Sequence, residues 1–329
     1  MKVSIIVPTY NEEKNINKCL YSLVNLDYPK KDYEIIVVDG MSQDKTRNIV
    51  KKYKNVRLFE NPKKFTSSNR NLGIKNAKYN YIAFTDADCF VPENWLKILT
   101  EKFYINLFFY PLLAGVGGAN IAPNNAENFT KAIWIAQSTF LGNRGSAQGR
   151  RFKEKQFVES LSTTNVLYDK KKLLEVGCFE EKLKHLAEDA HINFRLRQKG
   201  YKLLFIPKSY VYHNFRTTPK KFFNNMVRYG LGRMNLIKKY PESFSLIFLI
   251  PILFLIGMFM PFLALINKNG LFVIPWLYFP FIFSYSGYLA CKHNKFNIFD
   301  SIVVVYVSQH FGYALGMIKG LFTDRMEDY

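Results

Sequence analysis

The sequence VSIIVPTYNE at residues 3–12 combines an apolar, β-branched run at residues 3–7 with a polar segment at residues 9–12. The apolar run is typical of a buried strand. Similar runs recur three times, at residues 34–38, 56–59 and 81–84. Segments with helical periodicity separate them, at residues 13–26, 43–53 and 66–77. This alternation predicts a doubly wound α/β sheet with helices on both faces.

Polar residues follow the predicted strands where each strand ends. Thr9 to Glu12 follow the first, Asp39 follows the second, and Asp86-Ala87-Asp88 follows the fourth. Parallel strands bind ligands beyond their carboxyl ends, so these residues are expected to line a ligand site. The sequence has neither a Gly-x-Gly-x-x-Gly motif nor a Gly-Lys-Ser/Thr loop, which argues against a Rossmann dinucleotide site and a P-loop.

Two pairs of carboxylates are candidates for metal-binding or catalytic groups. Asp86 and Asp88 could hold a divalent cation through oxygen, and that cation could bridge a diphosphate. Asp-x-Asp also occurs by chance on solvated loops, but its position after a strand favours a site. Glu188 and Asp189 begin a predicted helix, where carboxylates equally serve to complement the helix dipole. Taken alone, this second pair favours the structural role.

Together the motifs resemble the family 2 inverting glycosyltransferases of the GT-A fold, over roughly residues 1–240. The segments that carry the resemblance are, in order, residues 3–12, 35–46, 70–73, 86–88, 187–189 and 195–201. Residues 136–138 and 142–146, together with the C-terminal apolar segments, are similar to the branch typified by a succinoglycan-biosynthesis glucosyltransferase. The resemblance implies a doubly wound mixed sheet with C-terminal transmembrane helices.

The resemblance also implies a role for individual residues. The nucleotide-sugar site would comprise Pro8, Tyr10, Glu12, Asp39, Arg70, Asp86 and Ala87, with Asp39 accepting a hydrogen bond from the base. Mg²⁺ or Mn²⁺ would be held by Asp88, Asp86 and His213, although a lone histidine is more often structural. Asp189 would be the general base, and Glu188 would orient it or the acceptor.

One motif of the processive synthases, Gln-x-x-Arg-Trp, is absent, and residues 225–233 occupy the comparable region. We therefore expect transfer of a single sugar from a nucleotide-diphosphate sugar, with a UDP-sugar as the predicted donor. The predicted acceptor is a hydroxyl of a lipid-linked or membrane-associated glycan, for cell-surface polysaccharide or glycoprotein glycan synthesis. The alternatives are a polyprenyl-phosphate sugar synthase, whose anionic acceptor needs no strong base, and a non-catalytic membrane-associated binding protein.

The net charge of +20 lies almost entirely in residues 1–242, because five basic and four acidic residues follow Ser243. A basic surface can attract anionic lipid headgroups, nucleic acid or a phosphorylated small molecule. Carboxylates at the strand ends would repel a polyanion, and no nucleic-acid-binding motif is present. We therefore predict membrane lipids, and not nucleic acid, as partners.

The C-terminal region contains long uncharged runs at residues 244–266 and 271–290. At ~1.5 Å per residue, each could cross a ~30 Å hydrocarbon core as a helix. A third run at residues 301–318 is weakened by Gln309 and His310, so two or three membrane helices are expected within residues 243–329.

Two basic segments that flank the uncharged runs predict how the protein is oriented in the membrane. Residues 219–242 have a cationic amphipathic pattern, suited to lying on an anionic leaflet or to packing on the soluble domain. Basic residues in this segment and in the loop at 291–300 predict that both face the cytoplasm. The expected protein is thus a multi-pass cell-membrane protein, with residues 1–218 as a cytosolic catalytic domain.

Overall fold

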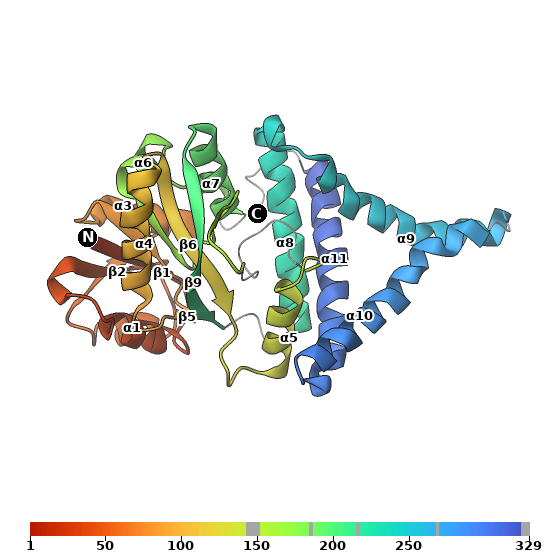
Figure 1. Cartoon of the computed structure of the whole chain (residues 1–329), viewed down its shortest axis with the longest axis horizontal. Helices are drawn as coiled ribbons and strands as arrows, with labels where there is room; N and C mark the ends of the chain where they lie inside the picture. Colours follow the sequence, from red (N-terminus) through yellow and green to blue (C-terminus); the bar gives the residue numbers. More distant parts are fainter. Residues whose placement is uncertain (143–151, 184–186, 215–217, 268–269, 324–329) are drawn as a thin grey trace. The chain divides into compact units, whose positions relative to one another are not determined.

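The computed structural model describes residues 1–142, 152–183, 187–214, 218–267 and 270–323, with side chains described outside residues 261–273. Residues 143–146 of the branch motif and Lys268 lie outside the described set. The chain folds into two compact units (Figure 1). The first unit comprises Met1–Pro123 and Asn143–Asn214, and the second comprises Asn124–Gly142 and Phe215–Tyr329.

The first unit contains a nine-stranded mixed sheet within the described residues, in the order β3-β2-β1-β4-β8-β6-β9-β5, with β7 paired to β9. The strands are β1 (Val3–Thr9), β2 (Tyr33–Asp39), β3 (Val56–Glu60), β4 (Tyr81–Phe84), β5 (Cys89–Phe90), β6 (Leu113–Ile121), β7 (Gln156–Phe157), β8 (Val166–Asp169) and β9 (Lys202–His213). The helices are α1 (Ile16–Val24), α2 (Thr46–Val50), α3 (Thr66–Asn76), α4 (Trp95–Phe109), α6 (Lys170–Glu175) and α7 (Glu188–Gln198), with 3₁₀ turns η1 (Lys30–Asp32) and η2 (Glu181–Leu183).

The N-terminal half of the sheet is parallel and the other half is mixed. Strand β1 pairs in parallel with both β2 and β4, and β2 pairs in parallel with β3. Beyond β4, strand β8 is antiparallel to β4 and β6, whereas β9 is parallel to β6 and antiparallel to β5. The predicted doubly wound mixed sheet is confirmed, with β1 to β4 at the predicted apolar runs.

Alternate residues of the central strand face opposite sides of the sheet, as the twofold strand period requires. Ile5 of β1 belongs to the hydrophobic core that includes residues of α1 and α4. Ile6 belongs to the opposite core, formed with residues of α3, α6 and α7. A Cβ on Gly73 of α3 would lie 2.5 Å from Ile6 Cγ2, so only glycine permits this close approach of helix to sheet. Helices therefore cover both faces, as predicted.

The second unit is helical. Its helices are α5 (Asn128–Gln137), α8 (Pro219–Lys239), α9 (Ile250–Asn267), α10 (Tyr278–Lys292) and α11 (Phe299–Phe322), with 3₁₀ segments η3 (Pro241–Ser243), η4 (Leu246–Leu249), η5 (Gly270–Leu277) and η6 (Phe296–Ile298). A Cβ on Gly316 of α11 would overlap the carbonyl oxygen of Val227 on α8. The two helix backbones are therefore in contact, and α8 packs its apolar side on α11.

The uncharged C-terminal runs are less regular than the sequence suggests. The run at 271–290 is divided between η5, which contains Pro275, and α10. Within the described residues, one helix is long and apolar enough to cross a membrane, Phe296–Phe322, with a mean hydropathy of 1.4 and 44% of its most apolar window buried. It coincides with the run that the sequence ranks weakest. By length and composition, this C-terminal helix fits membrane association.

Candidate active site

The loops that follow β1 and β2 lie side by side, because Thr9 pairs with Asp39 in the strand register. The backbone N–H of Asn11 donates to Ser42 Oγ at 2.8 Å. The N–H of Glu12 donates to Thr46 Oγ1, also at 2.8 Å. These bonds fix the segment that carries the predicted nucleoside-pocket residues. The sequence motif at 35–46 contains Ser42 and Thr46, but their role in holding the neighbouring loop was not predicted.

Three predicted pocket residues differ in exposure. Pro8 is buried beside Val38 in the neighbouring strand. Tyr10 is 45% exposed, so its ring is available to a ligand. Glu12 is half-buried, and its Oε2 accepts a hydrogen bond from Asn15 Nδ2 at 2.7 Å. A nucleoside would therefore meet Tyr10 more directly than Pro8.

Asp39 is fully buried at the end of β2. Its Oδ1 accepts from the N–H of Ser42 at 2.8 Å, and its Oδ2 accepts from Ser42 Oγ at 2.5 Å. Arg47 Nε lies 3.7 Å from Oδ1. In this arrangement the carboxylate organises its own loop, and its contact with a base stays a prediction.

The buried guanidinium of Arg70, on α3, joins two motifs that are far apart in sequence. Its Nη2 lies 2.9 Å from Asp86 Oδ1, and its Nη1 lies 2.8 Å from Glu188 Oε1. The Arg70 side chain is only 2% exposed. Two predicted site residues, Asp86 and Glu188, therefore bind a third, Arg70. This guanidinium links the Asp-x-Asp segment after β4 to the start of α7.

The charges in this group affect one another. Burial alone would lower the pKa of Arg70, but the carboxylates of Asp86, Glu188 and Asp189 outweigh it and raise the pKa. Burial raises the pKa of Asp86, opposed by the charge of Arg70. The guanidinium is thus permanently charged and holds both carboxylates in place.

The start of α7 has a strained backbone. Ala187 adopts φ of 50°, in the left-handed region that residues with a Cβ rarely occupy. Glu188 and Asp189 follow in the first turn, and Asp189 Oδ1 accepts from the N–H of Ala190 at 2.7 Å. Strain of this kind clusters at functional sites, where the surrounding structure maintains it.

A buried polar pair anchors this turn to the sheet. Tyr168 of β8 donates its hydroxyl to Asn193 Oδ1 at 2.6 Å, and Asn193 Nδ2 donates to the carbonyl of Leu161 at 2.7 Å. Burial, and then the charge of Asp189, raise the pKa of Tyr168. Neither Tyr168 nor Asn193 was predicted from the sequence as a site residue. A usable signal was that Asn193 follows Asp189 by four residues, one helical turn along the same face.

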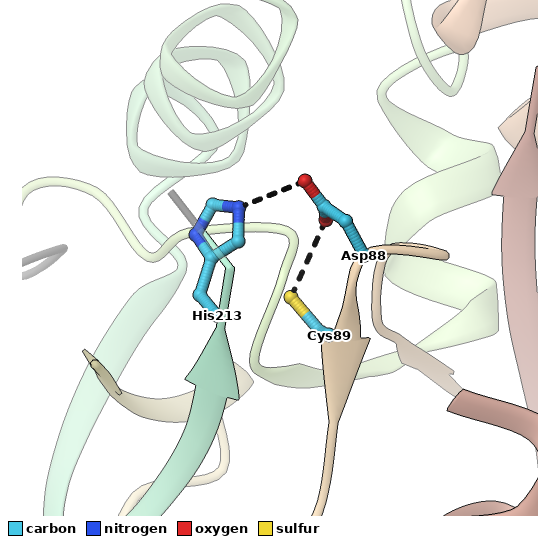
Figure 2. Close-up of side chains that lie close together, drawn as sticks. All are labelled: Asp88, Cys89 and His213. Atoms are coloured by element: carbon cyan, nitrogen blue, oxygen red, sulfur yellow. Dashed lines mark hydrogen bonds and ion pairs between the residues drawn. The ribbon is translucent and has the colours of Figure 1, made fainter. Parts of the chain in front are cut away.

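A second group of side chains lies where β5 pairs with β9 (Figure 2). His213 Nε2 is 3.2 Å from Asp88 Oδ2, and Cys89 Sγ is 3.7 Å from Asp88 Oδ1. Cys89 and His213 are direct partners in the antiparallel register. One potential ligand atom from each of the three residues lies within 4.8 Å of the others. The sequence predicted Asp88 and His213 but not Cys89.

The donor atoms of this group discriminate between metals. A carboxylate oxygen suits Mg²⁺ or Mn²⁺, whereas an imidazole nitrogen favours a transition-metal ion over Mg²⁺. Cys89 is 1% exposed and belongs to the hydrophobic core. Asp86 lies outside the group and pairs with Arg70, so its role as a ligand stays a prediction. Asp88 and His213 therefore offer ligand atoms that fit a divalent cation.

Residues 4–175, more than half of the chain, match the family described as glycosyl transferase family 2. The chain belongs to glycosyl transferase family 2. Its residues 86–88 therefore lie inside the family domain, whereas residues 188–189 and 213 follow it. The predicted enzyme class, a glycosyltransferase, is confirmed by this membership.

Two relatives that are named as glycosyltransferases agree with the assignment. The chain is 33% identical over 261 residues to a dolichyl N-acetyl-alpha-D-glucosaminyl phosphate 3-beta-D-2,3-diacetamido-2,3-dideoxy-beta-D-glucuronosyltransferase of Methanococcus voltae, covering 77% of this chain and 78% of that protein. It is 33% identical over 218 residues to glycosyltransferase AglE of Haloferax volcanii, covering 62% and 64%.

Among solved structures, the mannosyltransferase PcManGT of Pyrobaculum calidifontis, in complex with GDP-Man and Mn²⁺, aligns with a TM-score of 0.58. It is 16% identical and the alignment covers 94% of this chain and 86% of that one. At this identity the likeness concerns the fold. The predicted GT-A fold is confirmed.

Proposed function

We propose that this glycosyltransferase moves one sugar from a nucleotide-diphosphate sugar, with UDP as the nucleotide, to a hydroxyl of a lipid-linked or membrane-associated glycan. The observation that carries the proposal is the double ion pair of Arg70 with Asp86 and Glu188. It brings the donor-side segment and the predicted base segment to one buried cation. A site that binds a donor and activates an acceptor needs both segments together.

The reaction that this arrangement supports is a direct displacement. Asp189 accepts the proton of the acceptor hydroxyl, whose oxygen attacks the anomeric carbon of the donor. The bond from that carbon to the nucleotide diphosphate breaks, and the configuration inverts. Glu188 is fixed by Arg70 at 2.8 Å, so we assign it an orienting role, and we assign proton transfer to Asp189.

The donor would bind along the carboxyl ends of β1, β2 and β4. Exposed Tyr10 and half-buried Glu12 would contact the nucleoside, on a loop stabilised by Asp39 and Ser42. Asp86 would contact the ribose side of the nucleotide, whereas Ala87 is buried in the hydrophobic core and would only position its two neighbours. Asp88 and His213 would hold Mn²⁺, and the bound ion would neutralise charge on the departing diphosphate.

The nature of the acceptor is supported by the Glu188–Asp189 pair and by the relative in Methanococcus voltae, whose name describes transfer to a dolichyl-linked acceptor. The alternative acceptor, a polyprenyl phosphate, is already anionic and needs no base. A test incubates the full-length protein with Mn²⁺ and a panel of sugar nucleotides, and supplies either a polyprenyl-linked sugar or the bare polyprenyl phosphate. Transfer only to the bare phosphate would replace the proposed acceptor with the alternative.

We further propose that the protein is membrane-associated, with residues 1–218 facing the cytoplasm and residues 219–242 at the interface. The six basic residues of α8 and the apolar character of α9 support this placement. The multi-pass expectation rests on the runs at 244–266 and 271–290. Carbonate-resistant sedimentation of the full chain with membranes would support the proposed membrane association. Recovery of the protein in the soluble fraction would oppose it.

A further inference from the structure

Helices α8 and α11 are packed together over most of α8. A Cβ on Gly312 would lie 2.9 Å from Met226 Cβ, and a Cβ on Gly320 would lie 2.6 Å from Met234 Cβ. Near the end of α8, Lys238 Nζ donates to the carbonyl of Leu321 at 2.9 Å. Glycines at four-residue intervals allow this close approach of two helices. Any displacement of α11 therefore carries α8 with it.

Helix α8 is strongly basic. It carries six basic residues and no acidic residue, at Lys220, Lys221, Arg228, Arg233, Lys238 and Lys239. Lys220, Lys221, Arg228 and Lys238 are exposed. If α11 crossed a bilayer together with α8, the exposed side chains of Lys220, Lys221 and Arg228 would enter the hydrocarbon, which is costly for charged groups. A judgement of α11 by its length and hydropathy alone ignores the cost of burying the charges on α8.

Two polar residues of α11, Tyr306 and His310, bind other parts of the second unit, as polar residues of a core helix do. The hydroxyl of Tyr306 lies 2.8 Å from Thr139 Oγ1, next to the end of α5. His310 Nδ1 lies 2.9 Å from the hydroxyl of Tyr278 on α10, and its Nε2 lies 3.3 Å from the carbonyl of Leu141. Helices α5, α8, α9 and α10 all pack against α11. Protein, rather than lipid, therefore surrounds much of this helix.

Exposed apolar surface is concentrated on another part of the unit. Helix α9 has no charged residue, and η5 packs against it. In Figure 1, α9 runs out from α11 and α10 returns to it, as a hairpin. Large exposed apolar side chains of this hairpin include Leu253, Ile256, Phe259, Ile274, Leu277, Phe279, Phe281 and Phe283. Apolar exposure of this extent marks an interaction site.

We propose that the second unit docks on an anionic phospholipid bilayer from one side, with α9, η5 and α10 inserted as a hairpin. The α8–α11 pair lies along the headgroups, and α11 does not cross. Both ends of α11 are then on the side of the membrane that holds the N-terminus. This inference rests on the proposed membrane association and specifies which helices enter the lipid.

The charges around the hairpin identify the lipid. The six bases of α8 precede it, Lys292 ends α10, and Lys319 is exposed on α11. Basic residues next to an inserted apolar segment favour anionic headgroups, which attract each base by electrostatics. A zwitterionic surface carries no net negative charge to attract these bases, so the partner is an anionic lipid.

The topology is tested with the full chain carrying one protease-cleavable tag at each end. The protein is reconstituted in sealed vesicles of phosphatidylcholine and phosphatidylglycerol, floated to remove unbound protein, and treated with a protease that cannot cross the bilayer. We expect each molecule to lose both tags or neither, whatever its orientation. Detergent should expose all tags. Loss of one tag per molecule would mean that α11 crosses, and would overturn the inference alone. Failure to float would overturn it together with membrane association.

The surface role of α8 is tested by removing three exposed charges together, Lys220→Gln, Lys221→Gln and Arg228→Gln. A matched control removes three exposed lysines from the first unit, Lys51→Gln, Lys52→Gln and Lys54→Gln. We expect the α8 variant to partition at least roughly fivefold less onto phosphatidylglycerol-containing vesicles, and the control to change little. If both variants lost vesicle binding equally, the bases of α8 would contribute only through the net charge of the protein. That result would contradict α8 as a docking face.

Discussion

The guanidinium of Arg70 on α3 donates to Glu188 Oε1 on α7 at 2.8 Å, although 118 residues separate them in the chain. Its other terminal nitrogen holds Asp86 at 2.9 Å. Arg70 stacks near Phe179, whose ring centre is 5.5 Å from the guanidinium carbon. A buried cation that pairs two carboxylates keeps them at a fixed separation. The segments that carry Asp86 and Glu188 are thus held together by one side chain.

Replacing Arg70 by methionine is predicted to impair stability and activity together. The change leaves the Asp86 and Glu188 carboxylates without their buried partner, and breaking such pairs costs about 3–5 kcal/mol of unfolding free energy. Arg70→Lys keeps the charge but loses the forked geometry, so we expect an intermediate effect. The unfolding free energy by denaturant titration and the single-turnover rate check both variants.

The control for this prediction is Lys75→Met, which removes an exposed cation from the same helix. Exposed substitutions usually change the unfolding free energy by no more than about 0.5 kcal/mol. A rate for Arg70→Met equal to that of this control, measured under conditions where both are folded, would show that the bridge is not needed for transfer.

The Asp88–His213 group predicts metal-dependent donor binding. Asp88→Asn or His213→Ala should weaken Mn²⁺-dependent UDP binding by about 100-fold or more, because the first removes the negative charge of one proposed ligand and the second removes the other ligand. Even changes in residues that only support metal ligands cost about 10–100-fold. Calorimetry with and without Mn²⁺ measures the effect. Asp27→Asn, at an exposed carboxylate paired with Lys97, is the control. Undiminished binding by the Asp88 variant would rule out this metal site.

Much of the fold was predictable because its signal is local. Apolar β-branched runs and the intervening helical periods identify β1 to β4, and a polar residue at each strand end marks the ligand edge. The pairings within the site depend on distant packing instead. Nothing local in the sequence indicates that Cys89 lies opposite His213 in the sheet, or that Arg70 reaches Glu188.

The second unit illustrates the same limit. The amphipathic pattern of residues 219–240 correctly indicates a helix, α8, but several surfaces could cover its apolar side. The partner is α11, and glycines on both helices permit the contact, at Gly230 and Gly316. Likewise, counting uncharged residues could not reveal that one run is divided between η5 and α10. Helix partners are set by tertiary packing, which a one-dimensional pattern does not contain.

Glu34 predicts an acid-sensitive part of the stability. Its carboxylate accepts from Ser4 Oγ at 2.6 Å, from the N–H of Lys78 at 2.7 Å and from Arg57 Nη1 at 2.7 Å. Burial would raise the pKa of Glu34, but these donors outweigh it and the pKa falls below its ordinary value of 4.5. The folded state then binds this proton more weakly than the unfolded chain does. The resulting stability is present above the ordinary pKa and is lost as the pH falls through the folded pKa.

The Glu34→Gln variant tests this directly. It should be less stable than the parent by about 1.5–3 kcal/mol at pH 7, the range for hydrogen bonds to charged groups, and the difference should shrink as the pH is lowered toward 3. Denaturant midpoints across pH measure this convergence. Glu101→Gln, at an exposed position, should show no comparable trend. A constant difference between parent and Glu34→Gln at every pH would contradict the assignment.

The catalytic role of Asp189 is separable from a structural one by substitution with asparagine. The change keeps the size of the side chain and removes its ability to accept a proton, so single-turnover transfer should fall at least ~100-fold while donor affinity stays near normal. If Asp189 only complemented the helix dipole, its loss would cost roughly 0.3–1 kcal/mol of stability and leave the rate unchanged.

The matched control is Asp169→Ala, which removes a carboxylate that caps α6 by accepting from the N–H of Lys171 at 2.9 Å. That variant should lose about 1 kcal/mol and retain its rate. An Asp189→Asn protein with the rate profile of the Asp169 control would refute general-base catalysis. A folded variant that binds donor but does not transfer would support it, and would also argue against a phosphate acceptor, which depends less on a base.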